Sequence, residues 1–196
     1  ALPVAVIRAL QEAFEIRCKA LKNEYPDTYK ERIRREQKRY FGKFDQQLDR
    51  AQYGSCHLRK PAVAQVVVEH LHKHDGQLYD LHAYCIMPNH VHVLFDLSCQ
   101  LSEADALIGA IPEHYQQLHK VMRRLKGASA KAANTVLGRK GQFWMKDSYD
   151  HYIRNQKEWR NIEAYILNNP MKAGLVKSWE DWPYSYRRLQ SPPENR

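Results

Sequence analysis

The four cysteines of this 196-residue chain contain no Cys-x-x-Cys pair. They are Cys18, Cys56, Cys85 and Cys99. This spacing indicates neither a zinc ribbon nor a disulfide framework. No apolar run approaches membrane-spanning length, and Arg8 and Glu12 stand where a signal peptide needs apolar residues. The sequence also lacks internal repeats and low-complexity segments. These absences predict a cytoplasmic protein.

The length and composition predict a single folded domain. A chain of 196 residues can bury a sizeable core, and contents of 43% hydrophobic and 11% aromatic residues argue against disorder. The net charge of +9 indicates a polyanionic partner, although many soluble proteins are equally basic.

The positive charge is concentrated in two segments. Residues 17–43 contain ten basic and four acidic side chains, a net charge of +6, and residues 120–140 contain seven basic and no acidic side chains, a net charge of +7. A solvated helix face is the alternative interpretation of each segment. Because residues 120–140 contain no acidic side chain, a polyanion partner is favoured more strongly for that segment than for residues 17–43.

Periodicity and breakers predict a mixture of helices and strands. Helices are expected from the N-terminus to a break at 25–27, then at 28–39, 45–51, 61–74, 102–111, 112–127 with an extension to 137, and 157–168 before Pro170. Strands are expected at 77–87 and 90–97, joined by a turn at Pro88 and Asn89, and at 149–153. The aromatic segment 179–186 is expected to pack on the body of the protein.

Two short stretches have the residue types of a reactive site. Alternation along a strand sends His90 and His92 to one face, with their backbones about 7 Å apart. Two imidazoles so placed can bind one metal ion when a third ligand approaches. In the later helix, Tyr165 and Asn169 are spaced i, i+4 and share a face, so a phenol and an amide oxygen can reach the same ion.

These motifs together resemble a known family. The His-hydrophobic-His strand, its Met87-Pro88-Asn89 lead-in and the later Tyr-x-x-x-Asn-Pro helix resemble the single-tyrosine HUH transposases of the IS200/IS605 type, and most of all the REP-associated tyrosine transposases. Further matches are Gly141-Gln142-Phe143-Trp144, the stretches 149–154 and 168–176, and Trp182-Pro183-Tyr184-Ser185. The resemblance covers residues 61–186.

The resemblance implies an α+β fold with a ferredoxin-like antiparallel sheet flanked by helices. It divides a single domain, residues 1–196, into a basic helical N-terminal region (1–60), a catalytic core (61–186) and a tail (187–196). The family normally begins with an aromatic strand, whereas this chain begins in a helix, so the first strand is expected to be deleted or not visible. A homodimer would cover the exposed sheet edge; a monomer is the alternative. Residues 17–43 are a helical insertion without a role in the family pattern.

The resemblance also implies a chemistry. His90, His92 and Asn169 would hold a divalent metal ion, Mg²⁺ or Mn²⁺. Tyr165 would attack a phosphodiester of single-stranded DNA, giving a 5′-phosphotyrosine and a free 3′-OH. The sequence identifies no base for the phenol proton; the candidates are a hydroxide on the metal and His151, with Asp150 beside it as a further accessory residue.

By the same resemblance, the partner would be a DNA hairpin with an adjacent recognition tetranucleotide. Basic and aromatic residues are expected to hold its backbone and stack on its bases: Arg123, Arg124, Lys126, Lys131, Arg139, Lys140, Phe143, Trp144 and Tyr149. Phe143 and Trp144 are equally compatible with the core. The alternative functions are a non-catalytic DNA or RNA hairpin-binding protein and an HUH replication initiator or relaxase.

Overall fold

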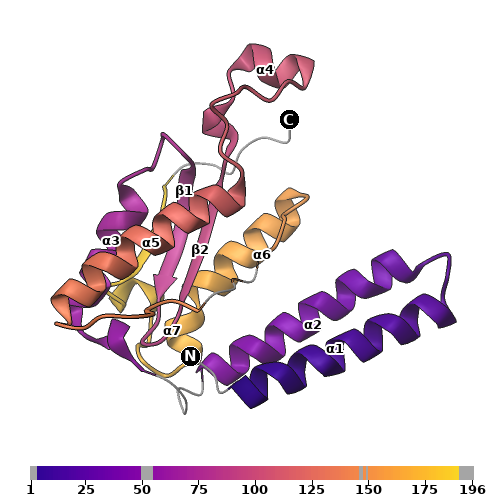
Figure 1. Ribbon diagram of the computed structural model, residues 1–196, viewed down its shortest axis with the longest axis horizontal. Helices are drawn as coiled ribbons and strands as arrows, with labels where there is room; N and C mark the ends of the chain where they lie inside the picture. The colour runs from indigo at the N-terminus through magenta and orange to yellow at the C-terminus, as the bar shows by residue number, and fades with distance from the viewer. Residues whose placement is uncertain (1–3, 50–54, 146–147, 149, 190–196) are drawn as a thin grey trace. The chain divides into compact units, whose positions relative to one another are not determined.

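The computed structural model describes residues 4–49, 55–145, 148 and 150–189. The chain divides into two compact units, Ala1–Cys56 and His57–Arg196, here the N-terminal and C-terminal units (Figure 1). The predicted organisation as one domain stays a prediction. In the part of the chain that is described, no helix combines the length and apolar character that a membrane span requires.

The N-terminal unit is a pair of long helices, α1 (Val4–Glu24) and α2 (Tyr29–Asp49). Aromatic rings join them: the centroids of Phe14 and Tyr40 are 5.0 Å apart, and those of Tyr40 and Phe44 are 6.3 Å apart. The sequence predicted two helical pieces here, at 28–39 and 45–51, and this is wrong. Helix α2 continues through Gly42 because Tyr40 and Phe44, one turn apart, lie on the same face.

The C-terminal unit is built on a three-stranded antiparallel sheet with the order β2-β1-β3. Its strands are β1 (Asp80–Ile86), β2 (Val91–Asp96) and β3 (Ser185–Arg187). The α+β class and the hairpin of the first two strands are confirmed. The strand predicted at 149–153 is wrong, because residues 150–153 are not in a strand. The third strand instead begins within the aromatic segment 179–186.

Long-range hydrogen bonds hold the aromatic segment 179–186 and the residues just after it against β1. The indole of Trp182 donates a hydrogen bond to the carbonyl oxygen of Ile86 (3.0 Å), and Arg188 Nε donates to that of Leu81 (2.8 Å). The rings of Tyr84 and Tyr186 stack with centroids 5.4 Å apart across the two strands. The prediction that this segment packs on the body is therefore confirmed.

Helices cover both faces of the sheet (Figure 1). The helices of this unit are α3 (Pro61–His72), α4 (Glu103–Ile108), which lies away from the sheet in Figure 1, α5 (Leu118–Val136), α6 (Gln156–Leu167) and α7 (Asn169–Lys172). Short 3-10 turns lie at His57–Arg59, Ser98–Gln100 and Trp179–Asp181. Helices α3 and α5 share one apolar cluster with one face of the sheet, and α6 packs on the other face. Strand alternation therefore turns Val91, Val93 and Phe95 toward α3 and α5 and leaves His92 and Leu94 for α6.

Among the helix boundaries that differ from the prediction, two have a clear physical reason. Helix α5 begins at Leu118 and not at Pro112, because the Gln100 amide binds the preceding loop: its Nε2 donates to the Gln116 carbonyl oxygen (3.1 Å) and its Oε1 accepts from the Gln116 N–H (2.7 Å). Pro170 does not end the tyrosine helix. Helix α6 ends at Leu167, and Pro170 lies in the first turn of α7, where its missing N–H needs no partner.

Candidate functional site

Two histidines converge at the start of β2. His90 directly precedes the strand, and His92 lies opposite Cys85 of β1. The Nε2 atoms of His90 and His92 are 3.0 Å apart. Two imidazole nitrogens that bind one ion at right angles, each about 2.1 Å from it, are separated by roughly 3 Å. The two side chains therefore have the spacing of adjacent ligands of a single metal ion.

Asn89 sets the proton positions of the first histidine. Its Oδ1 lies 2.7 Å from His90 Nδ1. A carbonyl oxygen only accepts hydrogen bonds, so Nδ1 carries the hydrogen and Nε2 of the neutral ring has the lone pair. Metal-binding histidines are commonly oriented in this way by a second residue. Asn89 was predicted only as a turn residue.

Asn169 has a buried oxygen without a hydrogen bond. It is the first residue of α7 and is fully buried. Its Nδ2 donates to the backbone carbonyl of Tyr165 (3.0 Å), whereas its Oδ1 has no hydrogen-bond partner. An unsatisfied buried oxygen costs about 1–3 kcal/mol, which a bound cation would offset. Two imidazoles and this amide oxygen are a suitable donor set for a divalent cation.

Tyr165 lies beside the histidines on α6. Its ring is edge-on to that of His92, with centroids 5.6 Å apart and planes 83° apart. The ammonium nitrogen of Lys172, at the end of α7, is 4.2 Å from the Tyr165 ring centroid. Lys172 was not predicted, although it follows Tyr165 by seven residues, which is two helical turns. The site therefore places a phenol between an imidazole and a cation.

His151, predicted as an accessory residue, contacts the first turn of α6. Its Nε2 lies 3.1 Å from Glu158 Oε1, and the second oxygen of Glu158 accepts the Arg154 N–H (3.2 Å). Glu158 was not predicted. Desolvation raises the pKa of the Asp150 carboxyl, and the positive charge of Lys126 opposes this shift. Tyr149 lies outside the described residues.

Of the four predicted DNA-binding residues on α5, three lie on its solvent side, and the fourth, Lys126, is half-buried. Buried residues of the helix follow its inner face: Val121, Leu125, Ser129 and Ala133. Arg123, Arg124 and Lys131 are exposed on the opposite side. An open depression of about 590 Å³ lies between the start of the helix and the preceding loop, lined by Glu113, His114, Tyr115, Gln116, Lys120, Arg123 and Arg124.

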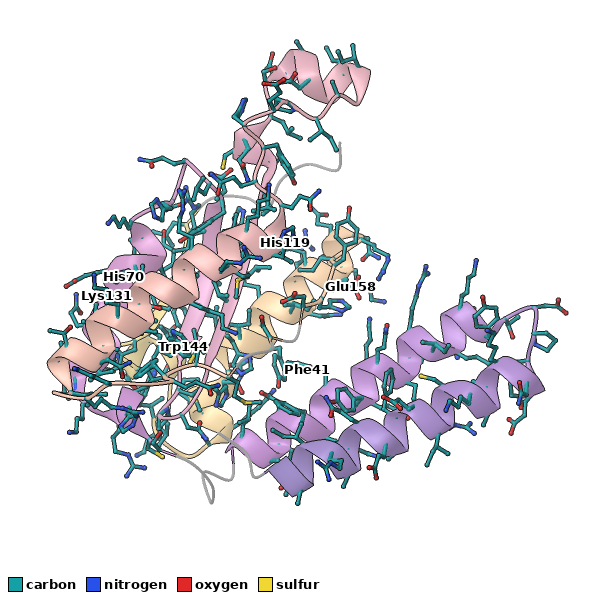
Figure 2. All side chains as sticks on the ribbon, viewed as in Figure 1. Phe41, His70, His119, Lys131, Trp144 and Glu158 are labelled. Carbon is teal, nitrogen blue, oxygen red and sulfur yellow. The ribbon has the colours of Figure 1, made fainter. Side chains whose placement is uncertain are left out.

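The other predicted DNA-binding residues take part in fold contacts, apart from exposed Lys140. Arg139 donates to His57 Nε2 (2.6 Å) and to the Gln142 carbonyl oxygen (3.0 Å). The Phe143 ring stacks on His57 with centroids 6.1 Å apart. Trp144 packs against the core under α5 (Figure 2), and its indole N–H donates to the buried Ser129 hydroxyl (3.0 Å).

Comparisons with known proteins agree with the motifs. No family model matches the chain. Over 104 residues it is 32% identical to a Haemophilus influenzae protein assigned to the REP-associated tyrosine transposases, covering 53% of this chain and 56% of that protein. Over 107 residues it is 29% identical to the REP-associated tyrosine transposase of Escherichia coli K12, covering 55% of this chain and 53% of that protein. The chain thus spans about half the length of these curated relatives.

A solved structure of a REP-associated tyrosine transposase bound to a REP hairpin is also similar, with a TM-score of 0.44 and 25% identity over 64% of this chain and 62% of that chain. The relatives confirm the resemblance predicted from the motifs.

Proposed function

We propose that this chain, a relative of the REP-associated tyrosine transposases over about half its length, is a metal-dependent endonuclease and strand transferase for single-stranded DNA at or near hairpins. The observation that carries the proposal is the convergence of His90 and His92, with Nε2 atoms 3.0 Å apart, beside the ring of Tyr165. Each of these residues has an unremarkable role elsewhere in proteins. Their combination is suited to phosphodiester chemistry.

The ion would be held by His90, His92 and Asn169. Their donor set, two imidazoles and an amide oxygen, accepts Mg²⁺ or Mn²⁺, and imidazole favours Mn²⁺. When bound, such an ion reduces the repulsion between a phosphodiester and its nucleophile and stabilises the negative charge of the transition state.

Tyr165 would be the nucleophile. Its Oη loses a proton and attacks phosphorus; the Oη–P bond forms as the P–O3′ bond breaks, and the leaving O3′ takes a proton. The product is a 5′-phosphotyrosine with a free 3′-OH. Attack by another 3′-OH reverses these bond changes. The covalent intermediate therefore keeps the energy of the phosphodiester bond available for strand transfer. His151, held by Glu158, stays a candidate accessory group for the proton.

Exposed cations on α5 would hold the DNA backbone. Arg123, Arg124 and Lys131 lie on its solvent face, where phosphate contacts give affinity without reading sequence. In agreement with the family resemblance, we propose a hairpin with an adjacent tetranucleotide as the substrate. We also propose that the sheet is a ferredoxin-like sheet with one strand fewer.

The first experiment is detection of a covalent adduct on a denaturing gel. The protein is incubated with Mn²⁺ and a hairpin oligonucleotide labelled at either end. The label at the 3′ end is expected to shift with the protein, because the tyrosine is joined to the 5′ end of the downstream fragment. Tyr165→Phe and a chelator should each abolish the shift. An adduct that persists in Tyr165→Phe overturns the assignment of the nucleophile. Hairpin binding without any adduct in the wild type overturns catalysis and favours a binding protein.

A further inference from the structure

Helix α2 carries most of the charge of the N-terminal unit on exposed side chains, and nitrogen-tipped side chains stand along it in Figure 2. Its exposed basic residues are Lys30, Arg32, Arg34, Arg35, Lys38, Arg39 and Lys43. The resemblance to the transposases gives this helix no role, since its motifs begin after residue 60. The side chains differ, however, in whether their charge is already satisfied.

Three of these arginines have partners within the unit. Arg35 forms an ion pair with Glu31 (2.6 Å), and Arg39 forms one with Glu36 (3.2 Å). The guanidinium of Arg32 lies 3.6 Å from the ring centroid of Tyr25. These contacts satisfy part of the positive charge of the three arginines.

Three further cations of α2 lie in a row. Lys30, Arg34 and Lys38 are spaced i, i+4, i+8, so they lie on one face at steps of about 6 Å over about 12 Å. Among the described residues, Lys30 and Arg34 form no ion pair. Like charges at this spacing destabilise a helix by a few tenths of a kcal/mol per pair. A polyanion along the row would reverse the sign of that contribution.

The chemistry of the helix favours nucleic acid over a membrane. A helix that lies on a membrane needs an apolar face for the lipid. In α2 that face is used within the unit, where Ile33, Tyr40 and Phe44 are partly buried and the ring of Tyr40 packs on Phe14. What α2 leaves exposed is charge without an apolar stripe.

We propose that Lys30, Arg34 and Lys38 form a second nucleic-acid contact, which binds the sugar–phosphate backbone of a base-paired stem. The inference rests on the proposed function for the identity of that nucleic acid, the hairpin substrate. Duplex DNA carries one charge per about 1.7 Å of axis, so a row of about 12 Å meets several phosphates in any register. The contact adds affinity and salt dependence and reads no sequence.

The test measures hairpin affinity as a function of salt concentration with the whole chain. Each phosphate contact contributes about 0.9 to the slope of log K against log salt concentration. The double variant Lys30→Gln/Arg34→Gln is expected to reduce the slope by about 1.8 and to weaken binding roughly 10- to 100-fold at 0.1 M salt. The matched control, Arg35→Gln/Arg39→Gln, removes the same charge from the same helix but from residues that already have acidic partners. Its slope should change by less than half as much.

Circular dichroism must first show that both variants keep their helices. The following outcomes then test the proposed contact. A slope unchanged in Lys30→Gln/Arg34→Gln overturns the inference, and so does an equal loss in both variants, which would reflect net charge alone. Binding to phosphatidylserine vesicles that the first variant abolishes, with the hairpin slope unchanged, would assign the row to lipid. A lack of adduct in every protein, with the slope effect present, would overturn the proposed catalysis and leave this contact standing.

Discussion

The ammonium of Lys172 lies 4.2 Å from the centroid of the Tyr165 ring. The two residues belong to different helices, α6 and α7, and the turn at Asn168 and Pro170 brings them together. In the proposed reaction, a cation beside this ring would stabilise negative charge that develops when the phenol attacks a phosphodiester.

Replacing Lys172 should slow the covalent step. We expect Lys172→Gln to lower the rate of adduct formation at saturating hairpin by about 100-fold, the usual effect of removing one group that stabilises transition-state charge. Lys172→Arg should keep most of the rate because it keeps the cation. Lys177→Gln, at an exposed position nearby in the sequence, is the control for loss of charge. If Lys172→Gln weakens only hairpin affinity and leaves the saturated rate intact, Lys172 holds DNA and takes no part in the chemical step.

Asn89 should act through His90. In Asn89→Ala the hydrogen on Nδ1 loses its acceptor, so the ring no longer has a fixed orientation and tautomer. Loss of such a supporting residue typically lowers metal affinity 10- to 100-fold. Titration calorimetry with Mn²⁺ should show this loss, and Asn89→Asp, which keeps an acceptor oxygen, should recover most of it. An equal Mn²⁺ affinity in Asn89→Ala and wild type would contradict the role.

Strand and helix periodicity were enough to select the central residues of the candidate site, whose function stays a prediction. Alternation placed His90 and His92 on one face, and the i, i+4 rule placed Tyr165 and Asn169 on another element. The convergence of the two Nε2 atoms could not be predicted, because it depends on side-chain torsions and on the hydrogen bond to Asn89. Lys172 was missed because Pro170 suggested the end of a helix, whereas a second short helix follows.

The errors in the prediction of the fold have the same origin, because they depend on contacts between residues distant in the sequence. A glycine inside a helix costs about 1 kcal/mol, but α2 continues through Gly42 because the packing of Tyr40 against Phe14 outweighs this cost. The loop before α5 is held by Gln100, sixteen residues before its partner Gln116. The three-residue strand β3 has no period of its own and is defined by its pairing with β1.

Trp144 should prove to be a structural residue. Its indole donates to Ser129, which is 2% exposed and itself donates to the Leu125 carbonyl oxygen (2.7 Å). Trp144→Phe removes this hydrogen bond and leaves a small cavity, so the free energy of unfolding should fall by about 1–3 kcal/mol. Urea unfolding measures that change, and hairpin affinity of the folded variant should stay within about twofold. Unchanged stability with a large loss of affinity would instead identify a base-stacking residue.

His57 should make the stability of the C-terminal unit depend on pH. Burial lowers the pKa of His57, and the positive charges of Arg139 and Lys60 lower it further. The ring is held neutral because its Nε2 accepts a hydrogen bond from the Arg139 guanidinium. In the unfolded chain a histidine titrates near pH 6.5. Just below that pH the unfolded state therefore binds more protons than the folded one, and the free energy of unfolding falls as the pH falls.

This contribution is complete above about pH 6.5 and is lost as the pH falls from there toward the lower pKa of the folded state. His57→Gln keeps an acceptor for Arg139 but cannot take up a proton. Its urea midpoint should therefore decline less between pH 7 and pH 5 than that of the wild type. His119→Gln, at an exposed position on α5, is the matched control and should decline as the wild type does. Parallel curves for wild type and His57→Gln would mean that protonation of His57 does not limit stability, and that Arg139 tolerates a charged ring beside it.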